Sequence, residues 1–171
     1  MTHIKRYPFT SFPNGWFAVA VSSDLKPGQV MPLRAFGQEL VLYRTTSGQA
    51  LLTEAYCPHQ GAHLGHGGKV EGERLRCPFH GWCFDGKSGA CVEVPFATKI
   101  PPRGKLRTWA VAEIDGMVFA HYHHAGDAPT WEVPSEDDGN WSEADVLQWE
   151  LKTCCQEVLE NSVDTSHLPT V

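Results

Sequence analysis

The chain has 171 residues, of which 42% are hydrophobic, and its formal net charge at pH 7 is −6. This length fits one domain, or one domain with part of a second, and the apolar content excludes a disordered chain because it is sufficient for a hydrophobic core. The acidic charge disfavours nucleic acid as a partner and is compatible with a basic redox partner.

Short apolar segments alternate with turn residues from about residue 10 to residue 122. The clearest turn is Asp115-Gly116, a dipeptide preferred in two-residue hairpins, and Phe36-Gly37-Gln38 is a second hairpin signal. Strands this short, recurring about every ten residues, are typical of an all-β domain. We expect strands over residues 16–21, 29–35, 39–45, 50–56, 90–94, 106–114 and 117–121, with a surface strand within residues 69–76.

Residues 57–82 contain the pattern Cys-x-His, seventeen intervening residues and Cys-x-x-His. Two thiolates and two imidazoles on two glycine-rich loops are the ligands of a Rieske [2Fe–2S] cluster, in which two cysteines bind one iron and two histidines bind the other. Neutral imidazoles remove negative charge from the cluster, so its potential should lie above the roughly −400 mV of plant-type ferredoxins. The predicted ligands are Cys57, His59, Cys77 and His80.

A structural zinc site is the main alternative for these four residues, because two cysteines and two histidines also bind zinc. Zinc sites usually separate paired ligands by about two to four residues, and the Cys-x-His pair is tighter than that. Both cysteines are followed by proline, which favours two matched loops. A disulfide would leave the histidines without a role. For the nearby His63 and His66 we expect structural or solvent-facing positions.

Four further cysteines remain, and none of them suggests a disulfide scaffold. Cys83 and Cys91 lie in strand-like sequence and should be small buried hydrophobic side chains. Adjacent cysteines rarely pair with each other, because the bridge would be strained, so we expect no disulfide between Cys154 and Cys155. The N-terminal residues 1–6 lack the apolar stretch of a signal peptide, and no apolar run approaches the roughly 18 residues of a membrane span. These features predict a reducing, cytoplasmic location.

The composition changes after residue 124. Residues 125–145 concentrate acidic side chains among prolines and glycines, which predicts a solvated linker at a domain boundary. Just before it, at the end of the last predicted strand, we expect a solvated edge formed by His121, His123 and His124.

The last segment, residues 146–171, begins with a predicted strand over 146–153 and continues with a predicted helix over 155–168 that Pro169 limits. Its apolar side chains should face inward. A polar side of the helix is formed by residues three apart: Asn161, Asp164 and His167. A carboxylate and a histidine at this spacing can meet a common metal, although polar residues at helical spacing usually form a solvated face.

From Cys57 to Trp82 the chain resembles the Rieske proteins, and among these the Rieske oxygenases. Rieske proteins of respiratory complexes carry an extra cysteine in each loop, joined as a disulfide, and a serine after the second His-Gly. This chain has Ala62, Phe79 and Trp82 at those positions. The resemblance therefore implies the low-potential, disulfide-free type, with an antiparallel β-sandwich holding the cluster in a Rieske domain over residues 1–124.

The segment Glu160-Asn161-x-x-Asp164-x-x-His167 is similar to the start of the iron motif in the catalytic domain of Rieske oxygenases. The resemblance implies that His167 is the first ligand of a mononuclear Fe(II), completed by a histidine five residues on and a distant carboxylate. It also implies that Asp164 links this iron to a Rieske histidine of a neighbouring subunit, and that Asn161 matches a position near the iron in some members. The second histidine would be residue 172. We therefore expect residues 146–171 to be the truncated strand–helix start of an α+β catalytic domain, and this fragment to transfer electrons without hydroxylating a substrate.

The function implied by the resemblance is that of an oxidoreductase. Electrons from an NAD(P)H-dependent reductase, with or without a ferredoxin, pass through the cluster to the catalytic iron, where O₂ is used to hydroxylate or desaturate a hydrophobic substrate. Residues 13–17 and 61–68 look most like the steroid and sterol oxygenase branch, with an aromatic substrate as the other expectation. A homotrimer is the family expectation.

Two other functions compete with this one. The first is a stand-alone Rieske ferredoxin, which should end near residue 122 and would have neither the acidic linker nor the tail motif. The second is a zinc-stabilised binding module.

Overall fold

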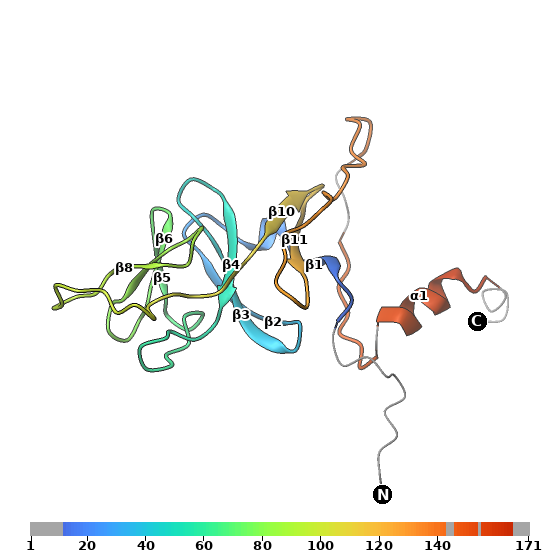
Figure 1. The fold of residues 1–171 in the computed structure, drawn as a ribbon. Coiled ribbons are helices and arrows are strands. Elements are labelled where there is room, and N and C mark those ends of the chain that lie inside the picture. The colour runs from blue at the N-terminus through green and yellow to red at the C-terminus, as the bar shows by residue number, and fades with distance from the viewer. Residues whose placement is uncertain (1–11, 143–145, 154, 166–171) are drawn as a thin grey trace, which may run out of the picture. The chain divides into compact units, whose positions relative to one another are not determined.

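The structure is a computed structural model that describes residues 12–142, 146–153 and 155–165 (Figure 1). Contacts divide the chain into two units, residues 1–140 and 141–171. The first unit is built from short strands: Gly15–Val21 (β1), Val30–Ala35 (β2), Gln38–Arg44 (β3), Ala50–Glu54 (β4), Lys69–Glu71 (β5), Arg74–Arg76 (β6), Cys83–Asp85 (β7), Cys91–Glu93 (β8), Thr108–Trp109 (β9), Val111–Ile114 (β10) and Met117–Tyr122 (β11).

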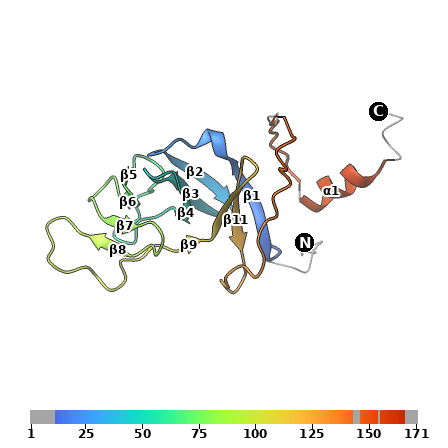
Figure 2. The same cartoon turned by 90° about the horizontal axis from the view of Figure 1, so that it is seen from above.

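These strands form three antiparallel sheets, with the orders β1-β11-β10, β2-β3-β4-β9 and β5-β6-β7-β8. A 3-10 turn, Ser22–Asp24, follows β1. Within the first unit, β2, β3 and β4 lie between the other two sheets in both views (Figures 1 and 2). The antiparallel, mainly β architecture predicted from the sequence is therefore confirmed.

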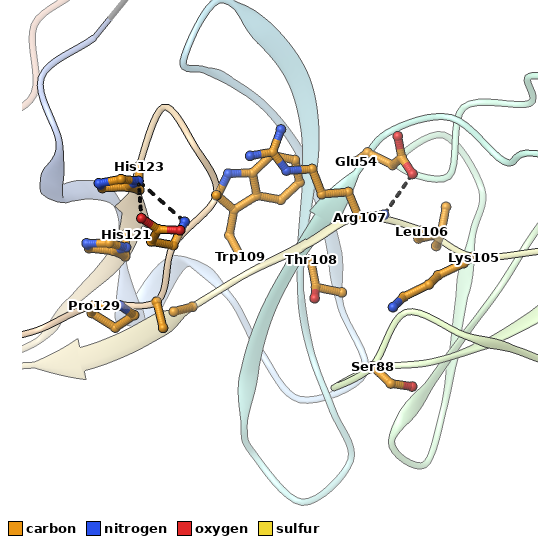
Figure 3. Close-up of a pocket in the computed structure, with 14 residues that line it drawn as sticks. Glu54, Ser88, Lys105, Leu106, Arg107, Thr108, Trp109, His121, His123 and Pro129 are labelled. Carbon is orange, nitrogen blue, oxygen red and sulfur yellow. Dashed lines mark hydrogen bonds and ion pairs between the residues drawn. The ribbon is translucent and has the colours of Figure 1, made fainter.

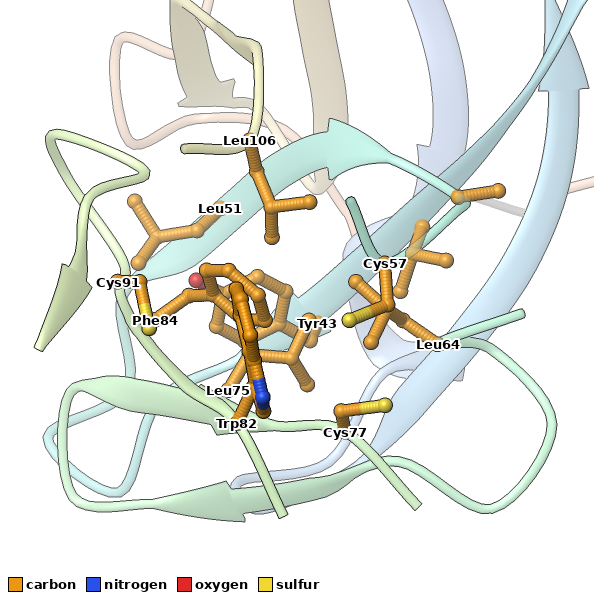
Figure 4. Packing of buried hydrophobic residues seen from close by; sticks show 12 residues of the cluster. Tyr43, Leu51, Cys57, Leu64, Leu75, Cys77, Trp82, Phe84, Cys91 and Leu106 are labelled. Carbon is orange, nitrogen blue, oxygen red and sulfur yellow. The ribbon is translucent and has the colours of Figure 1, made fainter. Parts of the chain in front are cut away.

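The central sheet separates two hydrophobic cores, because its strand β3 is buried on both faces. Leu40 and Leu42 point into the core shared with β11, whereas Val41 and Tyr43 point into the core shared with β6 and β7 (Figure 4). Successive side chains of a strand point to opposite faces of a sheet. The uninterrupted apolar run over residues 40–43 is thus the sequence pattern of a strand buried on both sides.

The two predicted hairpin turns are present. Ile114 pairs with Met117 across Asp115 and Gly116, whose φ angles are 49° and 77°. Such two-residue turns need positive φ at both positions, which explains the glycine. At the other turn Phe36 also has a positive φ, 54°. Its ring packs against Phe12, Phe17 and Tyr122, and these contacts hold the unfavourable backbone conformation.

The predicted strand over residues 106–114 is interrupted in the structure. Thr108 and Trp109 pair with β4 in the central sheet, whereas Val111–Ile114 pairs with β11 in another sheet. Ala110 lies between these two pairings, so the segment leaves one sheet and enters the next. The predicted surface strand within residues 69–76 is a hairpin formed by β5 and β6.

The acidic segment after β11 contacts the β domain. Trp16 Nε1 donates a hydrogen bond to the backbone oxygen of Trp131 (2.9 Å), and Asp115 accepts one from the Ser135 hydroxyl (2.6 Å). The expectation of a solvated histidine edge was wrong for His121, which is only 8% exposed because its ring packs edge-on against Trp16. The functional boundaries at residues 124 and 145 stay a prediction.

The second unit contains one helix among its described residues, α1 (Cys155–Val163). The predicted strand over residues 146–153 is absent from the described part of this unit, because no neighbouring strand there satisfies its backbone groups. This prediction was wrong.

The helix itself was correctly expected, although its described part ends at Val163, before the predicted end at residue 168. Its apolar side chains do not face inward: Val158, Leu159 and Val163 are 40%, 64% and 77% exposed. No helix in the described ranges is both long enough and apolar enough to cross a membrane.

Candidate iron–sulfur centre

Two loops with the same backbone frame carry the predicted ligands: loop 1, residues 57–62, between β4 and β5, and loop 2, residues 77–82, between β6 and β7. In each loop the cysteine N–H donates to the carbonyl oxygen five residues on, from Cys57 to Ala62 (2.9 Å) and from Cys77 to Trp82 (2.8 Å). The fifth residue of each loop is a glycine, and the two glycine φ angles are 73° and 70°. Side chains with a Cβ rarely adopt this conformation, which explains the matching glycines.

The strands fix both ends of each loop. Loop 1 follows β4 and is closed by a bridge between Tyr56 and His63, next to the hydrogen bond from Leu64 N–H to the Ala55 oxygen (2.7 Å). Leu64 is fully buried and anchors this segment in the core. Loop 2 connects β6 to β7 as the tip of a hairpin. Both loops are therefore held by pairing partners on either side.

The two predicted thiol ligands are buried at the inner ends of these loops. Cys57 and Cys77 are 2% and 4% exposed, and their sulfurs lie on the same side of the core, next to Leu64 (Figure 4). Burial raises the pKa of the Cys57 thiol to about 12, and the nearby Cys77 contributes to the rise. A metal binds the thiolate, so metal binding must displace a proton here.

The two predicted imidazole ligands lie at the exposed outer ends of the loops. The ring centroids of His59 and His80 are 4.7 Å apart. The His59 ring also stacks on the buried Trp82 at 4.7 Å and an interplanar angle of 9°, which fixes its orientation. The structure thus brings the four predicted ligands together as an inner sulfur pair and an outer nitrogen pair.

This donor set fits a [2Fe–2S] cluster, whose two irons take one ligand pair each. Within the described residues, no group of three His, Cys, Asp or Glu side chains is placed to hold a single metal ion. The separation into two pairs, one buried and one exposed, matches the asymmetry that a Rieske cluster requires.

Arg76 supports loop 2 and was missed by the sequence analysis. Its guanidinium donates to both carboxylate oxygens of Glu71 (2.6 and 2.7 Å), to both of Glu93 (3.0 and 3.1 Å) and to the Gly81 carbonyl (2.7 Å). These hydrogen bonds hold the pKa of both carboxyl groups below the usual range. The only signal in the sequence is the position of Arg76 directly before Cys77. The partner at position 93 becomes visible only when β8 lies next to β7.

His63 has the structural role expected for it. Its Nδ1 accepts a hydrogen bond from Gly65 N–H (3.1 Å), and its ring lies 4.3 Å from that of His66 and edge-on to Tyr56. Burial lowers the pKa of His63, and the proximity of His66 lowers it further. Both rings therefore belong to the packing of the segment after loop 1.

The tail residues are only partly described. Asn161 lies in α1, and Asp164 follows its last turn, where its N–H donates to the Glu160 oxygen (3.1 Å). Both residues are exposed. His167 lies outside the described residues. The mononuclear iron site predicted from these three residues therefore stays a prediction.

A pocket of about 680 Å³ lies beside β9, and its lining includes no residue of loop 1 or loop 2 (Figure 3). Its wall contains the Arg107 guanidinium, 4.6 Å above the ring of Trp109, and a contact of 3.5 Å between His123 Nδ1 and Asp127 Oδ2. Cations and the carboxylates of Glu54 and Asp127 thus share this wall, and neither ligand pair reaches it.

Two family comparisons cover most of the chain. Residues 15–113 match the sequence profile of the Rieske [2Fe-2S] domain. The chain belongs to the Rieske [2Fe–2S] domain family. Residues 120–171 match the profile of the 3-ketosteroid 9alpha-hydroxylase C-terminal domain. The resemblance to Rieske oxygenases of the steroid and sterol branch is therefore confirmed.

Individual relatives agree with this family. The chain is 40% identical over 160 residues to cholesterol 7-desaturase nvd from Xenopus laevis, covering 92% of this chain and 35% of that protein. It is 31% identical over 164 residues to the oxygenase component of 3-ketosteroid-9-alpha-monooxygenase from Rhodococcus rhodochrous, covering 92% and 42%. This Rieske chain thus spans well under half the length of these two curated relatives.

Solved structures give the same fold. A chain of the reduced complex between oxygenase and ferredoxin in carbazole 1,9a-dioxygenase has a TM-score of 0.58 and 26% identity to this chain. The match covers 65% of this chain and 29% of the other. The Rieske β architecture expected from the sequence is therefore confirmed.

Proposed function

We propose that this chain is the electron-transfer part of a Rieske oxygenase, with Cys57 and Cys77 as ligands of one iron and His59 and His80 as ligands of the other. The observation that carries the proposal is the pairing of two buried thiols with two exposed imidazoles on loops of identical frame. When bound, the cluster supplies one-electron redox chemistry.

The residues of the two loops divide the work of such a site. The buried cysteines hold the inner end away from water, and the outer imidazole edges give an electron a short path to a partner. Trp82 orients His59 by stacking, and Arg76 fixes the backbone directly after His80 through the Gly81 carbonyl. Support of this kind around the direct ligands sets ligand orientation and tunes a metal centre.

We propose the activity of the whole enzyme from its relatives. An NAD(P)H-dependent reductase or a ferredoxin donates electrons, and the enzyme uses O₂ to hydroxylate or desaturate a hydrophobic substrate of the sterol or steroid class. The names of the Xenopus and Rhodococcus relatives support this substrate class. The match of residues 120–171 to a hydroxylase C-terminal domain favours an oxygenase over a stand-alone ferredoxin.

The catalytic iron of this enzyme would be a mononuclear Fe(II) with His167 as its first ligand, Asn161 close by, and Asp164 linking it to the cluster of a neighbouring subunit in a homotrimer. Further ligands would come from beyond residue 171. A reducing compartment such as the cytoplasm suits the free thiols found among the described cysteines, namely Cys57, Cys77, Cys83 and Cys91.

Metal and sulfide analysis of anaerobically purified protein tests the cluster. We expect about two irons and two acid-labile sulfides per chain, with a visible spectrum that bleaches on reduction. About three irons per chain would contradict the expectation that this fragment lacks a complete mononuclear iron site. A colourless, sulfide-free protein holding one zinc per chain would overturn the proposed function.

A further inference from the structure

Charge is distributed unevenly in this acidic chain, and the stretch that contains both ligand loops has an excess of positive charge. Residues 57–107 contain eight of the 14 Lys and Arg residues but four of the 20 Asp and Glu residues. This stretch therefore carries a formal charge of +4, although the whole chain carries −6. Two of its four carboxylates, Glu71 and Glu93, are bound to Arg76. Most of the remaining cations are exposed and available to a partner.

The positive charge is densest in the segment that connects β8 to β9. Between Glu93 and Glu113 the chain has no carboxylate, and it carries Lys99, Arg103, Lys105 and Arg107. Among the described residues, Lys99 and Arg103 are exposed and take part in no ion pair. Unpaired cations on a surface attract an acidic partner over the Debye length, about 8 Å at physiological salt.

The same segment exposes apolar side chains. The Phe96 side chain is fully exposed, and Ile100 is 45% exposed. Phe96 also has a φ of 65°, a conformation that costs a residue with a side chain of this kind about 1–3 kcal/mol. A large aromatic ring turned into solvent on a strained backbone is a costly arrangement for a free surface. Aromatic side chains and arginines are, in contrast, enriched at protein interfaces.

This segment lies against loop 2. A Cβ placed on Gly81 would come within 3.0 Å of Pro95 Cγ, and one placed on Gly104 within 3.4 Å of the Trp82 ring. Cys91 N–H donates to the Gly104 oxygen (2.8 Å), which ties the end of the segment to β8. In both views the segment after β8 projects outward from the sheet (Figures 1 and 2). Pro95, the residue before Phe96, therefore packs against loop 2 directly after His80.

Loop 2 contributes a second exposed aromatic residue. Phe79 is 62% exposed, and its ring centroid lies 3.8 Å from that of His80. We name the surface made of these five residues the loop 2 patch: Phe79, Phe96, Lys99, Ile100 and Arg103. It combines an exposed aromatic ring beside a predicted imidazole ligand with a second exposed ring and two unpaired cations on the segment that contacts loop 2 through Pro95 and Gly104.

We propose that the loop 2 patch docks an acidic electron-transfer protein, a ferredoxin or a ferredoxin-like domain of a reductase. The inference rests on the proposed function and names the chemistry of the donor. One electron leaves the donor and enters the cluster, and no covalent bond changes. Nucleic acid and anionic membranes are poorer partners, because their extended negative charge would also meet the acidic remainder of the chain. The net charge of −6 suggested a basic redox partner, whereas the positive charge of this patch favours an acidic one.

Stopped-flow reduction of the cluster-loaded chain tests the proposal, with a reduced, acidic plant-type ferredoxin as the probe. We expect the second-order rate constant to fall at least tenfold between about 20 and 300 mM ionic strength. The double variant Lys99→Glu/Arg103→Glu should lose about tenfold at low salt and most of the salt dependence. Phe96→Ala should lower the rate constant by about threefold at every salt concentration.

The matched control is Lys26→Glu, which reverses one exposed charge in the turn before β2, outside the patch. It should change the rate constant less than twofold. All variants should bleach equally with dithionite, which separates docking from cluster loss. A rate constant that is independent of salt and of Lys99 and Arg103, in a chain with a full cluster, would overturn the docking proposal and leave the proposed function intact. Loss of self-association in the double variant, without a change in rate, would also overturn it, because the patch would then bind a second copy.

Discussion

Loop 1 and loop 2 share a backbone frame but differ in what surrounds them. Each closes with a hydrogen bond from its cysteine N–H and turns at a glycine of positive φ. A Cβ on Gly61 of loop 1 would meet no atom within 4 Å, whereas one on Gly81 of loop 2 would meet Pro95. The Gly81 carbonyl of loop 2 also accepts a hydrogen bond from the Arg76 side chain. Among the described residues, no side chain donates a comparable hydrogen bond to loop 1. The shared frame positions one cysteine and one histidine in each loop, and the surroundings decide how rigidly each loop is held.

The first way to break the comparison is to remove one thiolate from each loop. Cys57→Ser and Cys77→Ser should each abolish the cluster completely, because in the proposed site each loop supplies one of the two sulfur ligands of the same iron. The visible spectrum and iron content of the purified variants measure this. Cys83→Ala, which removes a buried thiol outside both loops, should keep the cluster. An intact spectrum in either serine variant would contradict the ligand assignment.

The second test compares the imidazole ligands. His80→Cys and His59→Cys each add a negative thiolate to the cluster, so each should lower the reduction potential, by roughly 100 mV or more given the gap between Rieske and all-cysteine clusters. Voltammetry measures the change. The conservative control is Lys26→Gln, which should leave the potential unchanged. An unchanged potential in a cysteine variant that still holds a cluster would mean that the histidine in question is not a ligand.

The ligand loops were the most predictable part of the molecule, because coordination chemistry fixes both residue type and spacing. The central strand β3 was equally readable, since the apolar run at residues 40–43 allows little other than burial on both faces. The break at Ala110 was not readable. The apolar run over residues 109–112 continues through this residue while the strand changes sheets, so the local pattern carries no mark of the change.

The support of loop 2 could not be predicted for a different reason. The alternating charges of residues 69–76 look like a single solvated strand, but the segment forms a hairpin of two strands, β5 and β6. Only the third dimension shows that Glu71 and Glu93 converge on one guanidinium. The prediction for the segment after residue 145 was wrong for a third reason. Its predicted strand over residues 146–153 depends on a partner strand, and no described residue provides one.

The third test removes the guanidinium that supports loop 2. Arg76→Gln leaves two carboxylates unpaired and the Gly81 carbonyl without its donor, so loop 2 should loosen and release the cluster several times faster. The cost in unfolding free energy should be about 1–3 kcal/mol. Loss of visible absorbance over time and urea unfolding measure the two effects separately.

Arg44 is the matched control for Arg76. It is 7% exposed, binds both carboxylate oxygens of Glu113 at 2.8 Å and also donates to the Leu25 oxygen, in the core away from the loops. Arg44→Gln should cost at least as much unfolding free energy, about 3 kcal/mol, because it leaves the part-buried Glu113 carboxylate and the Leu25 oxygen without their buried donor. It should leave the rate of cluster release per folded molecule unchanged. Equal release rates in the two variants would show that Arg76 supports only the fold.

The smallest expected effect gives the sharpest comparison of the loops. Gly61→Ala and Gly81→Ala place the same methyl group at nearly the same φ, so both should lose about 1–2 kcal/mol of unfolding free energy from the left-handed conformation alone. Gly81→Ala must in addition displace Pro95, whose Cγ would lie 3.0 Å from the new Cβ, at a further cost of about 1 kcal/mol. Urea unfolding of both variants measures the difference, in which the shared backbone term cancels. An equal loss in the two variants would mean that Pro95 yields freely. The segment carrying Phe96 would then be loosely attached to loop 2, and Gly81→Ala would shift the loop 2 patch at no cost beyond that of Gly61→Ala.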